Sequence, residues 1–513
     1  MPDINCSPEA FNVLNSAWVP VRLPDGRIVK VSPREVAQSP ALEVAHPRDD
    51  FSALITEVLV CLYQTLAAPA TQADRVALRK PGALPDLSGF ERAAHQFNLL
   101  GDGARFLQSP VPLGNEAPTS SLLFEAPGEK TRKLNKDFYV GRAAYQVVCH
   151  DCAPALLMLN QGHARVGGSG YRTALRGGSA MTVLIQGATL WETIRLNLLA
   201  TDSFLRDYSL EGAPLSTLLW ESPEVFTQAT VPTKQLGAYA SLWWMPLALR
   251  LTSRPNPAGE PCTLCGEVHA HVLGETVHKA ATASKAPAGL YHPHTAWTEK
   301  KDTADFLPVM VPKAAHMLRE WVSLNLGGSR PGTALAALSG LGVAAARDAR
   351  LWTFGPSCDK NTFSRWHNEV VPTLVHEELT AAELRGVALS LLEDSQKVLS
   401  LLGEALQQNK PPKPSVPLKG AAVQALATLT IACREQMGVA LSQVDADSGA
   451  LPLSVDEVFK ASIRRRAAAL FDEYVQFDGS APKGLQYALQ VRAKLRKQLG
   501  LASFKPSAKS VAK

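Results

Sequence analysis

The chain has 513 residues, of which 46% are hydrophobic and 19% are charged, and its formal net charge at neutral pH is +5. This length predicts two or more domains, and the composition excludes an intrinsically disordered protein. A dedicated non-specific nucleic-acid binder carries a larger basic excess than 52 basic against 47 acidic residues. Any contact with nucleic acid must therefore come from local basic patches.

The sequence contains no apolar run of the roughly 18 residues that a membrane span needs. Its first residues lack the basic and apolar regions of a signal peptide. We therefore expect a cytoplasmic protein with no membrane contact and with reduced thiols.

The N-terminal part predicts a mixture of strands and helices. Two short apolar runs, 17–21 and 27–31, flank a turn with the sequence Leu-Pro-Asp-Gly, which indicates a hairpin. Helical length and periodicity follow over 51–66, and a second helix is expected over 189–199. Between about 100 and 330 the apolar runs are short and interrupted by glycine and proline, which indicates long loops.

The C-terminal part predicts helices only. Apolar residues recur at helical spacing over 380–408, 418–444, 454–477 and about 485–499, with prolines or glycines between the segments. Four such helices with short connections are typical of an antiparallel bundle. The predicted fold is α+β, with a large mixed N-terminal domain (1–371) that holds a zinc-clamped loop region, a C-terminal four-helix bundle (372–501) and a flexible tail (502–513).

Two cysteine pairs give the strongest chemical signal, namely Cys149 with Cys152 and Cys262 with Cys265. Two residues between the cysteines of a pair let both thiolates reach one ion, and two pairs complete a tetrahedral four-thiolate zinc site. Four protein ligands leave no open position, so the zinc would be structural. The alternative is that four reduced thiols pack without metal.

A glycine-rich stretch covers 166–178, and glycine permits positive φ and a close approach of the backbone to a ligand. The stretch has neither a P-loop nor a dinucleotide-binding pattern, so ordinary turn formation is an equal alternative. Arg172 and Arg176 add phosphate-binding capacity.

A basic run over 129–142 contains four cations followed by Phe138 and Tyr139, a pattern suited to nucleic acid but also to a solvated loop. His292 and His294 offer metal ligation or acid–base catalysis, although a structural role is favoured. The sequence contains no recognised catalytic motif, so we predict that the protein is not an enzyme.

Several segments together resemble one family. They are Trp18-Val19-Pro20-Val21, Pro47-Arg48-Asp49-Asp50, the two cysteine pairs, Leu175-Arg176-Gly177-Gly178, Tyr291-His292-Pro293-His294, 359–367 and the helical C-terminus. Their order and spacing are similar to those of the CasA family, the large subunit of the type I-E CRISPR surveillance complex, Cascade.

The resemblance implies a non-catalytic protein that works with the other Cascade subunits and their guide RNA (crRNA). In that family the large subunit reads a short flanking motif of double-stranded DNA, the PAM, from the minor groove, whose code is degenerate. It then helps to open the duplex, form the R-loop and recruit a separate helicase-nuclease. Base pairing by the guide supplies most of the sequence specificity.

The resemblance also implies DNA-contacting residues. The family's glycine loop corresponds to Gly167, Gly168, Ser169 and Gly170, with serine in place of an expected glycine, and its mobile PAM-contacting loop to Phe138, Tyr139 and Val140. Its strand-separating wedge corresponds to Asp359, Lys360 and Asn361, with Lys360 where glutamine is expected. Its lysine finger corresponds to Lys279 or Lys285, of which Lys285 is preferred.

Two other functions fit the sequence less well. The protein could be a structural scaffold of a multiprotein complex without any reading of DNA. It could also be a zinc-dependent hydrolase that uses the histidines, but a zinc bound by four thiolates argues against this.

Overall fold

The computed structural model describes residues 11–126, 146–164, 174–208, 218–231, 236–282, 285–286, 289–299, 306–312, 317–326, 348–359, 362–408, 418–475 and 482–501. These residues form two compact units. The first extends to Val311 and also includes Ala349–Pro372, whereas the second contains one helix near residue 320 and everything from Thr373 onward. The predicted fold class, mixed α and β followed by a helical C-terminal region, is confirmed. The predicted domain boundaries stay a prediction.

The first unit is organised around helix α1 (Asp49–Leu66), which is apolar and buried over most of its circumference. Asp49 and Asp50 lie in its first turn, where carboxylates interact favourably with the helix dipole. Three short helices pack against it, namely α3 (Ser88–Ala93), α5 (Ala153–Gly162) and α6 (Leu190–Leu196). The other short helices of the first unit are α2 (Gln72–Leu78), α7 (Thr201–Tyr208), α8 (Glu224–Thr227) and α9 (Ala240–Trp243).

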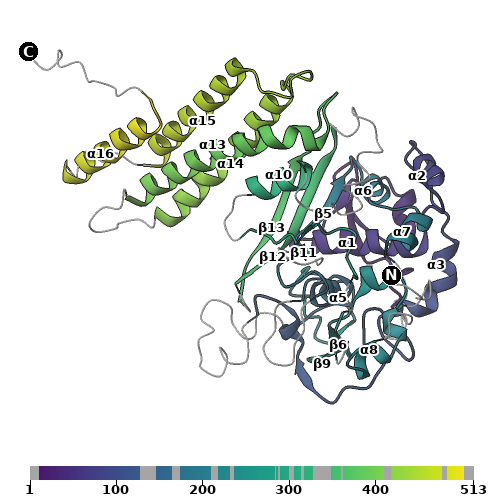
Figure 1. Ribbon diagram of the computed structural model, residues 1–513. Helices are drawn as coiled ribbons and strands as arrows, with labels where there is room; N and C mark the ends of the chain where they lie inside the picture. Colours follow the sequence, from purple (N-terminus) through teal and green to yellow (C-terminus); the bar gives the residue numbers. More distant parts are fainter. Residues whose placement is uncertain are drawn as a thin grey trace, which may run out of the picture. The chain divides into compact units, whose positions relative to one another are not determined.

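Short strands and 3-10 turns complete the first unit (Figure 1). The strands are β1 (Val19–Arg22), β2 (Ile28–Val31), β3 (Glu43–Val44), β4 (Glu116–Pro118), β5 (Thr182–Gln186), β6 (Leu247–Arg250), β7 (Ser253–Pro255), β8 (His271–Leu273), β9 (Thr276–Ala281), β10 (Trp297–Glu299), β11 (Phe306–Pro308), β12 (Arg350–Asp359) and β13 (Thr362–Pro372). The 3-10 helices are Pro33–Gln38, Ala94–Gln96, Thr119–Leu122 and Leu219–Glu221.

The hairpin predicted at the N-terminus is confirmed. β1 and β2 pair in antiparallel register, with Val19 opposite Val31. Gly26 closes the turn at φ +86°, a conformation that glycine adopts without steric cost. The helices predicted over 51–66 and 189–199 are present as α1 and α6, and Thr189 caps α6 by accepting a hydrogen bond from the Glu192 N–H.

A long hairpin, β12–β13, is the largest sheet element of the described residues, and β12 also pairs with β5. Figure 1 shows the three strands side by side, with the hairpin extending beyond β5. Asp359 ends β12 opposite Thr362. The segment predicted to act as a wedge thus follows a well-paired strand.

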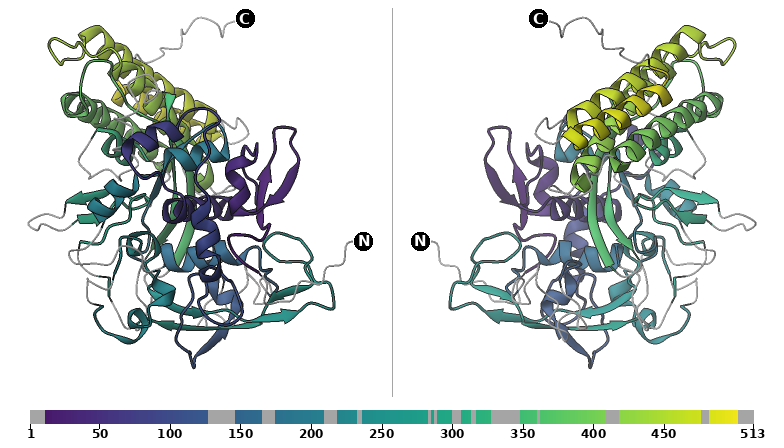
Figure 2. Two further views of the ribbon diagram at one scale, coloured as in Figure 1. Left: turned by 90° about the vertical axis from the view of Figure 1, so that its right-hand side faces the viewer. Right: turned by 90° about the vertical axis from the view of Figure 1, so that its left-hand side faces the viewer.

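The second unit contains four long helices, α13 (Ala381–Gln408), α14 (Leu418–Leu441), α15 (Leu453–Tyr474) and α16 (Pro482–Gln498), which pack side by side (Figures 1 and 2). They correspond closely to the predicted helices. A capping box starts α13, because the Thr380 N–H donates to the Glu383 carboxylate over 2.7 Å while Thr380 Oγ1 accepts from the Glu383 N–H.

A fifth helix, α10 (Leu318–Leu326), packs against α13 although it comes before the hairpin in sequence. Asn325 Oδ1 accepts a hydrogen bond of 2.8 Å from the Leu374 N–H, which ties α10 to the start of the bundle. The sequence pattern did not predict this packing. No described helix has the length and apolarity required to cross a membrane.

Candidate functional site: a four-cysteine cluster and a buried ionic cluster

The two cysteine pairs meet in the first unit. Cys149 Sγ lies 3.7 Å from Cys265 Sγ, and Cys152 Sγ lies 4.0 Å from Cys262 Sγ. All four sulfur atoms lie within 4.8 Å of one another. A disulfide requires about 2.05 Å between sulfurs, so these cysteines are free thiols. A tetrahedral ion with metal–sulfur bonds of about 2.3 Å separates its sulfurs by roughly 3.8 Å, and the observed distances fit that geometry.

The first pair lies at the start of α5. Cys152 is the N-cap of this helix, and the proline two positions later fits the first turn, where its missing N–H is not needed. The Cys149 N–H donates to Cys262 Sγ over 3.3 Å, which contributes to the packing of the two pairs.

The second pair lies in the tight loop between β7 and β8. Gly266, at φ +81°, lets the chain turn immediately after Cys265. The side chain of Asn256 connects the two ends of the loop by donating to the carbonyl oxygens of Glu260 and His269, each over 2.9 Å. The backbone N–H of Thr263 donates to the carbonyl of Val147 over 2.9 Å. The two pairs are therefore positioned by their own loops and by contacts between them.

Proximity perturbs the acidities of the thiols. The neighbouring Cys149 lowers the pKa of Cys262 to about 6, and hydrogen bonds from the surrounding thiols hold the pKa of Cys265 far below its ordinary value. The neighbouring Cys149 also raises the pKa of Cys152 well above its ordinary value. Thiolate is the form that binds metal. Four sulfurs with this spacing can hold a metal ion, and all four coordination positions would come from the protein.

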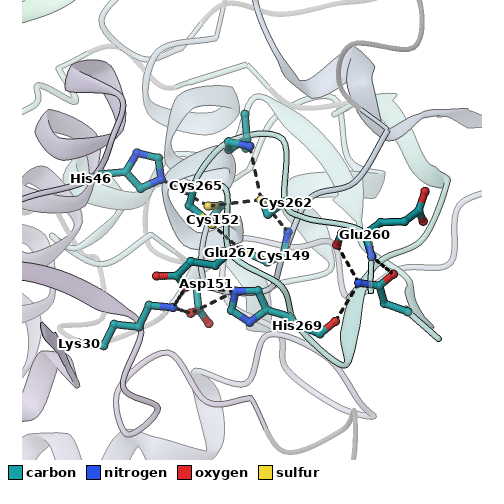
Figure 3. Close-up of polar contacts among 12 residues, drawn as sticks. Lys30, His46, Cys149, Asp151, Cys152, Glu260, Cys262, Cys265, Glu267 and His269 are labelled. Carbon is teal, nitrogen blue, oxygen red and sulfur yellow. Dashed lines mark hydrogen bonds and ion pairs between the residues drawn. The ribbon is translucent and has the colours of Figure 1, made fainter. Parts of the chain in front are cut away.

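Charged side chains surround the cluster (Figure 3). Lys30 Nζ pairs with Asp151 Oδ2 over 2.5 Å and also with Glu267, while His269 Nε2 lies 3.4 Å from Glu267. His46 Nε2 lies 3.4 Å from Cys152 Sγ. The sequence did not predict the roles of His46 and Lys30. Each lies more than a hundred residues before its partner, Cys152 for His46 and Asp151 for Lys30, and no spacing pattern connects them.

A second cluster, which we call the ionic clamp, consists of Glu57 on α1, His163 after α5, and Arg176. Glu57 Oε1 lies 2.7 Å from Arg176 Nη2, and Glu57 Oε2 lies 2.7 Å from His163 Nε2. Arg176 is only 1% exposed. The expectation that Arg176 provides phosphate-binding capacity is therefore wrong, because its guanidinium is buried and engaged by Glu57. Arg172 lies outside the described residues.

His292 and His294 are both buried, with exposures of 4% and 1%, as expected for structural histidines. Together with Cys61 they form a second group whose ligand atoms lie within 4.8 Å of one another. His292 Nδ1 accepts a hydrogen bond from the His294 N–H over 3.2 Å. Its other nitrogen must then carry the proton of the neutral ring, which does not fit metal ligation. Cys61 and Cys433 are also buried.

Only some of the predicted DNA-contacting residues lie in the part of the chain that the structure describes. Most of them lie outside the described residues, namely Phe138, Tyr139, Val140, Gly167, Gly168, Ser169, Gly170, Lys360 and Asn361. Lys279, on β9, is half-buried and donates to the carbonyl of Ser121 over 3.3 Å and to Asn160 Oδ1 over 3.4 Å. Lys285 is exposed. The backbone of Asp359 ends β12.

Comparison with known proteins gives consistent matches. The model of the family described as CRISPR-associated protein Cse1 matches residues 12–470. Thermus thermophilus CasA (Cse1) is 19% identical with a TM-score of 0.65, and Thermobifida fusca Cse1 is 16% identical with a TM-score of 0.68. Each alignment covers 96% of this chain and 99% of the other. A chain of a CRISPR RNA-guided surveillance complex matches with a TM-score of 0.56 and 16% identity, over 95% of this chain and all of that one.

Proposed function

The chain belongs to the CRISPR-associated protein Cse1 family, and from this membership we propose that it is the large subunit of a crRNA-guided type I-E complex. In this proposal it reads the PAM of double-stranded DNA, promotes duplex opening and R-loop formation, and recruits the helicase-nuclease. The observation that carries the proposal is the family match over residues 12–470, and the fold shared with a chain of a surveillance complex supports it.

The four-cysteine cluster holds a structural zinc in this proposal. Bound zinc would join the start of α5 to the loop between β7 and β8, segments more than a hundred residues apart in sequence. Because four thiolates complete its coordination, the ion would have no free position for a substrate. The cluster supports the DNA-reading unit and does not act on DNA itself.

The protein has a non-catalytic role in this proposal. The histidines that a hydrolase would need are buried, and the buried ring of His294 donates to the carbonyl of Asn197 over 3.2 Å. Metal-assisted hydrolysis requires an ion with an open position near substrate. The four-thiolate geometry of the cysteine cluster favours a structural ion instead.

Of the two candidate lysine fingers, we propose Lys285. Its side chain is exposed, whereas the ammonium of Lys279 donates to Ser121 and Asn160 within the fold. Withdrawing Lys279 to contact phosphate or a base edge would break these bonds. Replacing Lys285 with alanine should weaken binding to DNA with an intact flank more than replacing Lys279 does, provided that both variants remain folded.

The decisive experiment reconstitutes a guide-loaded complex with and without this protein. Its affinity is measured for duplex DNA that carries either the intact or a scrambled flanking motif. We expect tight binding only with the protein and only with the intact flank. Binding that is equally strong without the protein, or that ignores the flank, would contradict PAM reading and favour the scaffold function.

A second experiment addresses duplex opening. Separating DNA costs on the order of 1.4 kcal/mol per base step, so a wedge needs to bias only the first steps before the guide pairs. Replacing Lys360 with alanine should slow R-loop formation while leaving assembly with the guide-loaded subunits unchanged. Equal R-loop rates for the variant and the parent would remove Lys360 from the proposed wedge.

A further inference from the structure

The ionic clamp lies at the two ends of the segment 165–173, which contains the predicted glycine loop. The chain enters this segment through His163 and Ala164 after α5, and leaves it through Ala174 and Arg176. The Ala174 N–H donates to the carbonyl of Ala164 over 3.5 Å, so the two ends meet.

Arg176 connects the C-terminal end of the segment 165–173 to its N-terminal end. Its Nε donates to the carbonyl of Gly162, the last residue of α5, over 3.1 Å. Its Nη1 donates to Thr182 Oγ1 on β5 over 2.7 Å. The planar guanidinium thus spans the end of α5 and the start of β5, and its rigid fork makes this arrangement directional.

Glu57 is the common partner. Its carboxylate is fully buried, and one oxygen faces Arg176 while the other faces His163. Thr182 Oγ1 also donates to Glu57 Oε1, over 3.2 Å. Although burial opposes ionisation, the Arg176 guanidinium and His163 hold the pKa of Glu57 well below its usual range. An ionised carboxylate on α1 therefore holds both ends of the segment.

The clamp also touches the long hairpin. The ring of His163 packs against Trp366 on β13, with ring centroids 5.7 Å apart. The position of His163 is therefore set by α1 on one side and by the hairpin on the other.

We propose that Glu57 is a positioning residue for recognition of the DNA flank: its carboxylate, through Arg176 and His163, fixes the two ends of the glycine loop. This inference rests on the proposed function. A buried ion pair is an inefficient source of stability, because desolvation cancels much of its attraction and an apolar replacement is often neutral or stabilising. What a buried, hydrogen-bonded ion pair does provide is a fixed geometry. Here the geometry that it fixes is that of the two ends of the glycine loop.

The test replaces both charges at once, in the double variant Glu57→Gln/Arg176→Met. The two substitutions preserve volume approximately and leave no unpaired buried charge, so the fold and the cysteine cluster are expected to survive. The guide-loaded complex containing the variant is then assayed with duplexes that carry the intact or the scrambled flank. The preference for the intact flank should fall by about tenfold, the effect of about 1.4 kcal/mol, with unchanged thermal unfolding, metal content and subunit assembly.

A matched control removes an ion pair of the second unit. Arg492 and Asp472 form a bidentate pair with both distances 2.6 Å, and Arg492→Met/Asp472→Asn should leave flank preference unchanged. Should the Glu57/Arg176 double variant not assemble, Thr182→Val removes, at nearly constant volume, the hydroxyl that donates to Glu57 and accepts from Arg176. We expect this substitution to lower the preference by about threefold.

The outcomes separate this inference from the proposed function. If Gly168→Val lowers flank preference but the clamp variants do not, the clamp has no positioning role and PAM reading stands. If none of these variants changes the preference, the proposal that the glycine loop recognises the DNA flank is contradicted. If the clamp variants weaken binding to both duplexes equally, or lower the unfolding temperature in parallel, the clamp is merely structural and the inference is overturned.

Discussion

The hydroxyl of Ser179 accepts a hydrogen bond of 3.0 Å from the backbone N–H of Cys358. Ser179 directly follows the glycine-rich stretch 166–178, and Cys358 directly precedes the predicted wedge. A nearby carbonyl, that of Ala180, lies against Gly355 of the same strand. The chain segments that lead into the predicted glycine loop and the predicted wedge are therefore hydrogen-bonded to each other. If the proposed function holds, this contact would couple the position of the loop to that of the wedge.

Gly355 allows this close approach. Its φ is +152°, and a Cβ atom at this position would lie 2.6 Å from the Ala180 carbonyl oxygen. Because the obstacle is backbone, Gly355→Ala should destabilise the first unit by about 1–3 kcal/mol. Chemical denaturation followed by tryptophan fluorescence will measure the loss, since every tryptophan except Trp321 lies in the first unit.

Gly386 supplies the opposite case. It lies inside α13, and a Cβ atom there would meet nothing within 4 Å. Gly386→Ala should therefore stabilise the second unit by about 0.5–1 kcal/mol, because alanine loses less backbone entropy in a helix. Circular dichroism of the helical transition tests this. Equal effects of the two alanine substitutions would mean that the approach of Ala180 to Gly355 is not constraining.

The ionic clamp predicts a strongly non-additive pair of substitutions. Glu57→Gln alone should destabilise the first unit by about 3–5 kcal/mol, because it leaves the Arg176 guanidinium buried without its counter-charge. Adding Arg176→Met should return the free energy of unfolding to about that of the parent. A double-mutant cycle in denaturant gives the coupling free energy, and simple additivity would contradict the pairing of these two residues.

The Glu57 carboxylate also predicts that the free energy of unfolding decreases at acidic pH. The folded-state pKa of Glu57 lies below its ordinary value of 4.5, although burial acts in the opposite direction, because Arg176 and His163 favour the charged form. Its contribution to stability is thus fully present above pH 4.5 and is lost as the pH falls below that value. The double variant should show a shallower decline of unfolding free energy below pH 4.5 than the parent.

Local patterns in the sequence predicted much of the fold. The Asp-Gly turn predicted the β1–β2 hairpin, and apolar periodicity predicted α1, α6 and the four long helices. The cysteine spacing identified the cluster. Long-range pairings were not predictable, because α10 packs on α13 and His46 approaches Cys152 without any shared local pattern. Arg176 was misinterpreted for the same reason: a cation beside glycines resembles a phosphate ligand until its partner Glu57, more than a hundred residues earlier, is known.

His294 predicts a second, milder pH dependence. Burial lowers its pKa from 6.5 to about 4, so the folded protein keeps the ring neutral where the unfolded chain takes up a proton. The unfolding free energy should fall by up to about 1.4 kcal/mol per pH unit as the pH drops from 6.5 to 4, and this component is absent above pH 6.5. His294→Gln, which keeps a donor for the carbonyl of Asn197 but does not titrate, should flatten this range. The exposed His95→Gln is the control, and identical pH profiles for the two variants would contradict the assignment.

The cysteine cluster predicts a metal-dependent fold of the first unit. Cys262→Ser should abolish stoichiometric zinc in the purified protein and lower the unfolding temperature of the tryptophan-rich unit, because binding energy of a structural zinc is also folding energy. Cys433→Ala, which removes a buried thiol of the second unit, should retain the zinc. Zinc retention should also weaken as the pH is lowered, since the thiolates must give up the ion to bind protons. Elemental analysis with and without a chelator makes the measurement. A parent protein that contains no metal, and whose unfolding temperature a chelator leaves unchanged, would show that the four thiols pack together without an ion.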